Sequence, residues 1–162
     1  MKIKIYTVGG TIDKVYFDKL SDYEVGESVV TQMLKDANVQ FDFEIEPVMR
    51  KDSLDMSDED RQILFEKISA DKTEHVLITH GTDTVIQSAL ILQQIKDKVI
   101  VMTGAMQPAR FKDSDATFNI GFALGAMQVL KHGVYIAING KIFDPSKANK
   151  VRTLNIFEHK EN

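Results

Sequence analysis

The sequence contains no cysteine, which removes disulfide bonds, thiolate nucleophiles and zinc–thiolate sites from consideration. It also lacks an excess of positive charge, because 20 lysines and arginines stand against 24 aspartates and glutamates in 162 residues. A protein that follows a phosphate backbone needs a basic face, so nucleic acid is not an expected partner. No apolar run approaches the roughly 20 residues of a membrane span, and no charged stretch followed by an apolar run opens the chain. We therefore expect no membrane association and a cytoplasmic location.

The composition is that of an ordinary globular protein. Hydrophobic residues make up 43% of the chain and charged residues 27%, which is enough for one well-buried core. We expect a single domain that spans residues 1–162.

Short apolar runs rich in β-branched residues alternate with helical patterns. Strands buried in a parallel sheet are predicted at Lys2–Val8, His75–Thr79, Val99–Thr103 and Val134–Ile138. Apolar residues three and four apart predict helices at Glu27–Ala37, Asp58–Ala70, Thr84–Ile95 and Phe118–Lys131. Ser57 and Asp60 form a variant capping box before the second helix, and Phe41–Pro47 alternates as a half-exposed edge strand does. The pattern predicts a three-layer α/β fold with a doubly wound, mostly parallel sheet, whose ligands bind beyond the carboxyl ends of the strands.

A small, polar turn follows each of the four buried strands. These turns are Gly9-Gly10-Thr11, T-H-G-T-D-T at 79–84, T-G-A-M-Q-P at 103–108 and Asn139-Gly140. None has the Gly-Lys-Ser/Thr of a P-loop, the spaced glycines of a dinucleotide site or the Gly-x-Ser-x-Gly of a serine hydrolase. His75 and His80 lie five apart and point to opposite faces of a strand, so they do not form a metal pair. We expect no cofactor and no metal, and threonine and aspartate remain as the chemical groups.

Three of these motifs resemble those of a known family. G-G-T-I at 9–12, H-G-T-D-T at 80–84 and G-A-M-x-P at 104–108 are similar to the bacterial-type L-asparaginases, threonine amidohydrolases that split asparagine into aspartate and ammonia. Further similar segments are S-D-Y-E-V-G at 21–26, D-S-L-D-M at 52–56 and N-G-K-I-F-D-P-S-K-A-N-K at 139–150. The resemblance implies the flavodoxin- or Rossmann-like fold of the family's amino-terminal domain. Because it covers only that first domain, we expect the second domain to be absent.

The resemblance also implies catalytic roles. Thr11 would be the nucleophile that forms an acyl-enzyme, and Tyr23 would polarise its hydroxyl. Thr82, Asp83 and Lys150 would form a second catalytic group. These residue types suit the chemistry, because an unassisted hydroxyl is a weak nucleophile and a lysine can accept a proton only when it is neutral. Taken singly, each of these residues has an ordinary structural role, and the three motifs together favour catalysis.

The implied substrate-binding positions surround the same strand ends. Ser53 would lie near the α-carboxylate, Asp83 would hold the α-ammonium, and the backbone around Ala105 would contact the amide. The full set of expected binding residues is Gly10, Asp52, Ser53, Gly81, Thr82, Asp83 and Ala105. We interpret Gly9 and Gly10 as clearing space for the substrate amide beside Thr11, and we expect His80 to lie beneath its loop and orient it by hydrogen bonds.

The sequence departs from the family pattern at several positions. Asp13 and Lys14 place a charge pair beside the proposed nucleophile, Gln107 stands where arginine is common, and Leu54 follows the binding serine. The segment D-A-T-F-N at 115–119 replaces one that normally includes Asp-Gly-Pro-Phe-Asn. In the family, a glutamate from the neighbouring subunit's second domain completes recognition of the substrate ammonium. The chain is then either a naturally short relative, which we favour and in which Asp13 or another acid compensates, or a fragment with an incomplete site.

These observations leave three functions to compare. The expected function is hydrolysis of L-asparagine, or of a related small amino-acid amide, by a homo-oligomer, a dimer or a tetramer. The first alternative is a non-catalytic module that binds aspartate or a similar amino acid. The second is an amidase that acts on a larger amide substrate.

Overall fold

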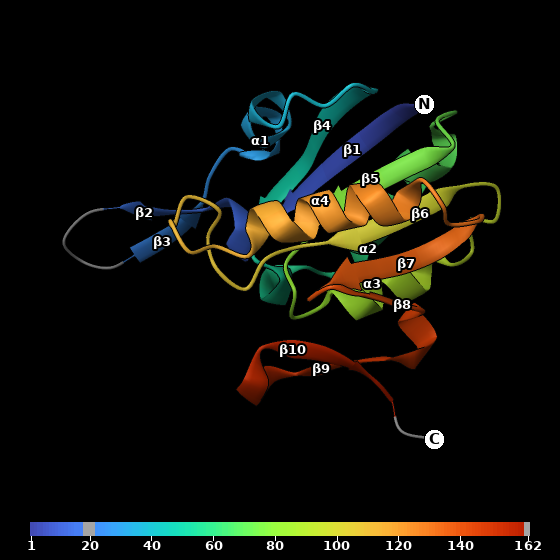
Figure 1. The fold of residues 1–162 in the computed structure, drawn as a ribbon. Coiled ribbons are helices and arrows are strands. Elements are labelled where there is room, and N and C mark those ends of the chain that lie inside the picture. Colours follow the sequence, from blue (N-terminus) through green and yellow to red (C-terminus); the bar gives the residue numbers. More distant parts are fainter. Residues whose placement is uncertain (18–21, 161–162) are drawn as a thin grey trace.

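The computed structural model describes the backbone of residues 1–17 and 22–160 and the side chains of residues 1–15 and 24–160. Its centre is a six-stranded sheet in the order β4-β1-β5-β6-β7-β8 (Figure 1). The parallel strands are β4 (Asp42–Lys51), β1 (Lys2–Gly9), β5 (His75–Thr79), β6 (Val99–Thr103) and β7 (Gly133–Ile138), and β8 (Lys141–Phe143) is the antiparallel edge. Numbered along the chain, the parallel strands have the flavodoxin-like order 2-1-3-4-5. The predicted doubly wound, mostly parallel sheet is confirmed.

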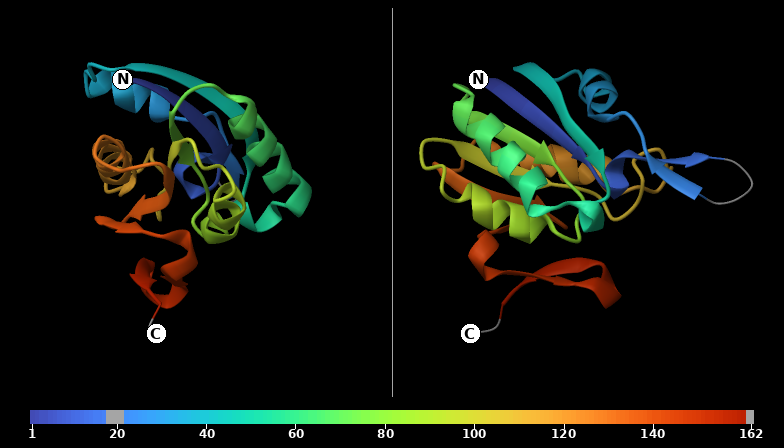
Figure 2. Two further views of the ribbon diagram at one scale, coloured as in Figure 1. Left: turned by 90° about the vertical axis from the view of Figure 1, so that its right-hand side faces the viewer. Right: turned by 180° about the vertical axis from the view of Figure 1, so that it is seen from behind.

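Helices cover both faces of the sheet (Figure 2). One face carries α1 (Val30–Asp36) and α4 (Ala116–Met127), and the other carries α2 (Asp58–Ala70) and α3 (Val85–Leu92). Val76 and Ile78 of β5 lie in the core under α2 and α3, whereas Leu77 between them lies in the core under α1 and α4. Because successive side chains of a strand point to opposite faces, one apolar run supplies both cores.

Several predicted elements are confirmed, and others end at different residues. β5, β6 and α2 have the predicted bounds, and the capping box is present, with Ser57 Oγ accepting from Asp60 N–H at 3.2 Å. The other three helices are shorter than their apolar patterns, and the edge strand β4 is longer. The apolar patterns predict helices that are too long, because apolar residues in the turn after a helix can still face the core. Ile95 is an example: its N–H donates to Leu92 O in a tight turn, and its side chain is buried.

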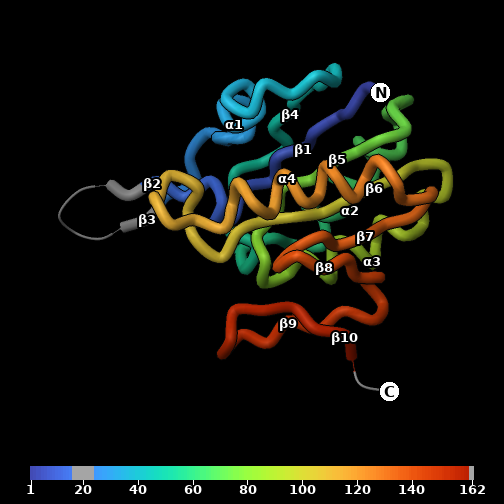
Figure 3. Tube along the Cα trace, viewed as in Figure 1, coloured from blue at the N-terminus to red at the C-terminus, as the bar shows by residue number. Residues whose placement is uncertain are grey.

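Smaller elements complete the fold. Two hairpins were not predicted, β2 (Lys14–Phe17) with β3 (Asp22–Val25) and β9 (Ala148–Val151) with β10 (Ile156–His159). Single 3-10 turns are present at η1 (Thr11–Asp13), η2 (Ser53–Asp55), η3 (Pro145–Lys147) and η4 (Arg152–Leu154). The β9–β10 hairpin lies beside the β8 edge (Figure 3), and the strands β2 and β3 project from the end where the parallel strands finish (Figure 1). Within residues 1–17 and 22–160, no helix has both the length and the apolar character that crossing a membrane requires.

Candidate active site

The loops that follow β1, β4, β5 and β6 touch one another at glycines. A Cβ atom on Gly10 would lie 2.3 Å from the Cα of Gly81, and one on Gly81 would lie 2.5 Å from the Ser53 side chain. A Cβ on Gly104 would lie 2.3 Å from the carbonyl oxygen of His80. No side chain fits at such distances, so glycine is what allows these loops to pack. They meet beyond β1 and β5, at the switch point where ligands bind in doubly wound sheets.

The structure gives Gly9 and Gly10 a different role from the predicted one. Both have positive φ angles, 102° and 89°, which favour glycine. The space in front of them is filled by other backbone: Gly10 N–H donates to Lys51 O at 2.9 Å, and a Cβ on Gly9 would lie 2.7 Å from that oxygen. The interpretation that these glycines clear space for a substrate is therefore wrong, because Gly9 allows β1 and β4 to approach and Gly10 allows the loops after β1 and β5 to pack on each other.

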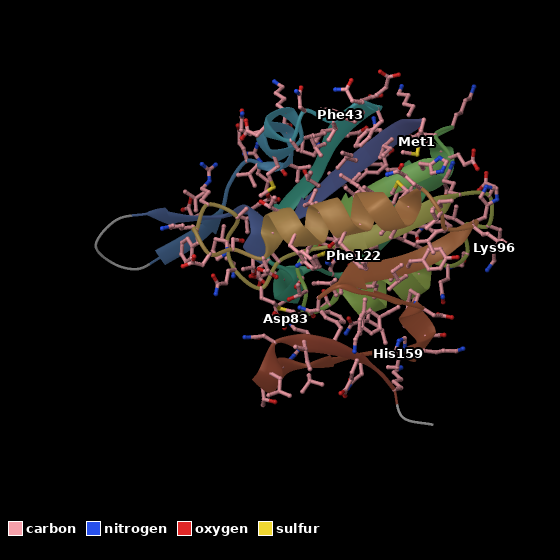
Figure 4. All side chains as sticks on the ribbon, viewed as in Figure 1. Met1, Phe43, Asp83, Lys96, Phe122 and His159 are labelled. Carbon is pink, nitrogen blue, oxygen red and sulfur yellow. The ribbon has the colours of Figure 1, made fainter. Side chains whose placement is uncertain are left out.

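Three of the predicted catalytic side chains are bonded to one another. Lys150 Nζ donates to Thr82 Oγ1 at 2.7 Å and to Asp83 Oδ1 at 2.8 Å. The Lys150 side chain is only 10% exposed, and Arg152 Nε lies 3.6 Å from the same Asp83 oxygen. Figure 4 shows Asp83 between the ends of the central strands and the β9–β10 hairpin. Lys150 lies 67 positions after Asp83 and 68 after Thr82 in the sequence. The hairpin that carries Lys150 folds back over the strand ends and brings it to these residues.

Lys150 is held in place by the hairpin that carries it. Lys150 in β9 is paired with Phe157 in β10, and the Phe157 side chain is buried against Phe143, with ring centroids 6.1 Å apart. The aromatic contact anchors the hairpin to the sheet edge, and the paired strand fixes the backbone of Lys150.

His80 lies beneath the loop, as predicted. Its ring is fully buried, with Nδ1 2.8 Å from Gly81 O and Nε2 2.8 Å from Ser88 Oγ. Burial lowers the pKa of His80 to about 4, so the ring is neutral near pH 7. A carbonyl oxygen only accepts hydrogen bonds, so Nδ1 donates to Gly81, and Nε2 accepts from the Ser88 hydroxyl. This arrangement ties the loop before Thr82 to α3.

The predicted substrate-binding segment is packed against the β5 loop. The Ser53 side chain is buried, and the carbonyl of Ser53 accepts from Thr84 Oγ1 at 2.7 Å. Asp52 accepts from Leu54 N–H at 3.1 Å and pairs with Lys14 Nζ at 2.7 Å. Burial raises the pKa of Asp52, but the Lys14 ammonium and the Leu54 N–H outweigh it and hold the pKa below its usual range.

Thr11 belongs to the short turn η1 and is half-buried. The contact between Gly10 and Gly81 places this turn against the loop that carries Thr82. Ile12 O also accepts from Ala109 N–H at 3.0 Å, which joins the turn to the loop after β6. Tyr23 is in β3, paired with Tyr16, and its side chain lies outside the described residues.

A cleft of about 600 Å³ opens beside the Ser53 segment, and Thr11, Thr82, Asp83 and Lys150 do not line it. Its lining residues are Lys14, Glu24, Val25, Arg50, Lys51, Asp52, Leu54 and Asp55. Ala105, the predicted contact for the amide, has a buried side chain. In the part of the chain that the structure describes, no group of three or more His, Cys, Asp or Glu side chains is placed to hold a metal ion.

Comparisons with known proteins agree with this geometry. Residues 2–160 match the family model described as asparaginase, N-terminal. The chain belongs to the asparaginase family. It is 33% identical over 172 residues to L-asparaginase 2 of Escherichia coli strain K12, a match that covers 95% of this chain and 47% of that protein.

Solved structures of asparaginases share the fold. The probable cytoplasmic L-asparaginase of Campylobacter jejuni has a TM-score of 0.83 at 30% identity, over 98% of this chain and 52% of that one. The thermostable L-asparaginase of Thermococcus kodakarensis gives the same TM-score at 25% identity, over 98% and 51%. This chain therefore spans about half the length of the asparaginases that it matches.

Sequence reasoning missed two polar residues that shape the candidate site, Asp115 and Asn119. The Asp115 carboxylate accepts from Met106 N–H at 2.9 Å and from Gln107 N–H at 3.0 Å. Asn119 Nδ2 donates to Gly104 O at 3.0 Å and to Asp115 at 2.9 Å. Both residues belong to 115–119, where the sequence departs from the family pattern but gives no sign of this role.

Asp13 also differs from its expected position. The predicted pair of Asp13 and Lys14 is divided, because Lys14 pairs with Asp52 while the Asp13 side chain is 2% exposed and accepts from Val29 N–H. A carboxylate buried against α1 does not line the entrance to the site.

Proposed function

We propose that this chain hydrolyses the side-chain amide of L-asparagine, or of a closely related small amino acid, to a carboxylate and ammonia. The observation that carries the proposal is the pair of bonds from Lys150 Nζ to Thr82 Oγ1 and Asp83 Oδ1. Thr82 and Asp83 stand on a loop that touches the turn of Thr11. Membership of the asparaginase family supports the same reaction.

The chemistry proceeds in two steps. The Thr11 hydroxyl attacks the amide carbon, and the nitrogen takes a proton and leaves as ammonia, which leaves an ester on Thr11. Water then attacks the ester carbon, releases the carboxylate product and restores the hydroxyl. Both steps need a group that moves protons near the reacting oxygen. Thr82 Oγ1, bonded to the Lys150 amine, is the group we assign to this role.

The cleft beside Ser53 supports a small, charged substrate. It carries side chains of both signs, which suits a molecule with an ammonium and a carboxylate, and such a molecule would share Lys14 with Asp52 and Lys51 with Asp60. The cations are Lys14, Arg50 and Lys51, and the anions are Glu24, Asp52 and Asp55.

The test is ammonia release from L-asparagine by the purified chain. Thr11→Ala, Thr82→Ala and Lys150→Met should each lower kcat by about 100-fold or more, the range for loss of a nucleophile or proton-transfer group. Lys147→Met is the matched control, since Lys147 is an exposed lysine in η3 three residues away, and it should leave kcat unchanged. Circular dichroism establishes that each variant is folded.

Other results select the other functions. Absence of ammonia release from asparagine, glutamine and a panel of related amides would reject small-amide hydrolysis. A rise in melting temperature with L-aspartate, without turnover, identifies a binding module, because a ligand that binds only the folded state stabilises it. Turnover confined to larger amides identifies an amidase of the other class.

We further propose that the chain acts in the cytoplasm as a homo-oligomer. The location is supported by the Campylobacter relative, which is called a probable cytoplasmic enzyme. An exposed aromatic side chain on α4 supports association, since Phe118 is 61% exposed and stacks on the partly buried Phe122. A light-scattering mass equal to one chain would contradict association.

A further inference from the structure

A second hollow, here called the Asp13 cavity, lies on the α1 face of the sheet. Its volume is about 270 Å³, and its wall includes Thr7, Asp13, Ser28, Thr31, Met49 and Arg50. Thr82, Asp83 and Lys150 do not line it. It is therefore distinct from the group of Thr82, Asp83 and Lys150, although Arg50 lines both this cavity and the cleft beside Ser53.

Asp13 is a buried carboxylate that faces this cavity. It accepts from Val29 N–H at a long 3.4 Å, and Ser28 lines the same cavity. Among the residues that the structure describes, no lysine, arginine or histidine nitrogen lies within 4 Å of it. Burial raises the pKa of Asp13, although Ser28, the Val29 N–H and the more distant Arg110 and Arg50 oppose this. A carboxylate accepts about four hydrogen bonds, so Asp13 can accept more from a ligand in the cavity.

The lining of the cavity also carries the opposite charge at Arg50, beside a second acid, Glu27. The Arg50 side chain is 53% exposed and pairs with Glu27 at 3.3 Å. Its planar guanidinium suits a carboxylate, because both oxygens can be bound at once. Ile45, Pro47 and Met49 add apolar side chains to the same lining. The volume lies just below the usual range for small-molecule pockets, which suits a small ligand.

We propose that the Asp13 cavity binds a small α-amino acid, with its ammonium at Asp13 and its carboxylate at Arg50. This site is additional to the proposed active site and does not depend on its activity. Asp13 shares the single turn η1 with Thr11, and Asp13 N–H donates to Gly10 O at 3.1 Å. An amino acid bound to Asp13 therefore acts on the turn that holds the proposed nucleophile.

Nuclear magnetic resonance of the ¹⁵N-labelled chain tests this proposal, with glycine as the probe and methylamine and acetate as its charged fragments. Glycine should cause saturable shifts of the amides of residues 13 and 26–29, methylamine should bind there more weakly, and acetate should bind most weakly. Asp13→Asn should weaken glycine binding by about tenfold or more. Arg50→Gln should weaken glycine binding to a similar extent and leave methylamine binding unchanged.

Asp83→Asn separates the two sites, because it alters the proposed active site and should leave the shifts at 13 and 26–29 in place. Two results would overturn the proposal. In the first, glycine shifts the amides of residues 82–84 and 150, and these shifts are lost in Asp83→Asn. In the second, glycine leaves the amides of residues 26–29 unshifted. If Asp13→Asn fails to fold, Arg50→Gln decides the question, because its side chain is exposed and equal glycine affinity would reject the site. Failure of asparagine hydrolysis leaves this binding test unaffected.

Discussion

His80 shows how a single buried residue fixes the loop that carries the proposed catalytic residue Thr82. Its neutral ring donates to Gly81 and accepts from Ser88, so one side chain satisfies polar groups on both the loop and α3. A protonated ring would have two donors and would lose the bond that it accepts from Ser88. The loop before Thr82 therefore depends on the ring staying neutral.

This dependence predicts a loss of stability in acid. The pKa of His80 is about 4 in the folded chain and about 6.5 in the unfolded chain, so the unfolded state binds the proton first as the pH falls. The stabilisation that comes from keeping His80 neutral is complete above about pH 6.5 and is lost as the pH falls toward 4. From pH 7 to pH 5 the free energy of unfolding should fall by about 2 kcal/mol through this group. Urea unfolding at both pH values measures it.

Two variants identify His80 as the group responsible. His80→Gln should remove this part of the fall between pH 7 and pH 5. His132→Gln changes an exposed histidine that bonds to Glu74, and it should keep the wild-type fall. An undiminished fall in His80→Gln would mean that another group carries the acid sensitivity.

At the scale of elements, a chain of asparagine contacts connects the loop after β6 to the β9–β10 hairpin. Asn119 Nδ2 donates to Gly104 O, its Oδ1 accepts from Asn139 N–H at 3.2 Å, and Asn139 Oδ1 accepts from Phe157 N–H at 3.1 Å. Because Phe157 is paired with Lys150, the position of the proposed catalytic amine is set from α4. Asn119 and Asn139 are positioning residues in this view.

Asn139→Gly tests this connection. Asn139 has a φ of 52°, so glycine keeps the backbone conformation and removes only the side-chain acceptor. We expect the loss of about 1 kcal/mol for one hydrogen bond, faster hydrogen exchange at the Phe157 amide and a lower kcat with KM little changed. The control is Asn149→Ala, which removes an exposed bond to Glu158 in the same hairpin and should change neither kcat nor the exchange rate. An unchanged kcat in Asn139→Gly would show that the hairpin positions Lys150 without this contact.

The same elements show what could be predicted from the sequence. β5, β6 and α2 were predicted to the residue, because their apolar period and the cap at Ser57 agree. The β9–β10 hairpin was not, because most of its side chains are exposed and its anchor, Phe157, is buried only through contact with Phe143 across the sheet edge. A short hairpin is marginal without such tertiary contact.

At the scale of the whole molecule, the parallel sheet explains why motifs far apart in sequence meet. The sequence placed Thr11 and Thr82 at strand ends, and their strands are neighbours. Lys150 was assigned only through family resemblance, since nothing local in the sequence distinguishes it from other lysines. Asp115 and Asn119 were missed because their role depends on backbone N–H and C=O groups that only the folded loops present.

The packing of these loops on one another gives the last prediction. Gly10→Ala would place a Cβ 2.3 Å from the Cα of Gly81 at a φ of 89°, so both strain and overlap oppose it. We expect the free energy of unfolding to fall by at least about 2 kcal/mol and the proposed activity to be lost.

Gly121 in α4 is the matched control for this change. A methyl group on Gly121 would have no neighbouring atom within 4 Å, and the residue is exposed inside the helix, so Gly121→Ala should raise the free energy of unfolding by up to about 1 kcal/mol. Urea unfolding should show that the same substitution lowers the free energy of unfolding at Gly10 and raises it at Gly121. Equal stability in Gly10→Ala and the wild type would mean that the β1 and β5 loops can separate without cost. The loops at the switch point would then be flexible. Substrate binding, and not loop packing, would have to bring Thr11 and Thr82 together for the proposed reaction.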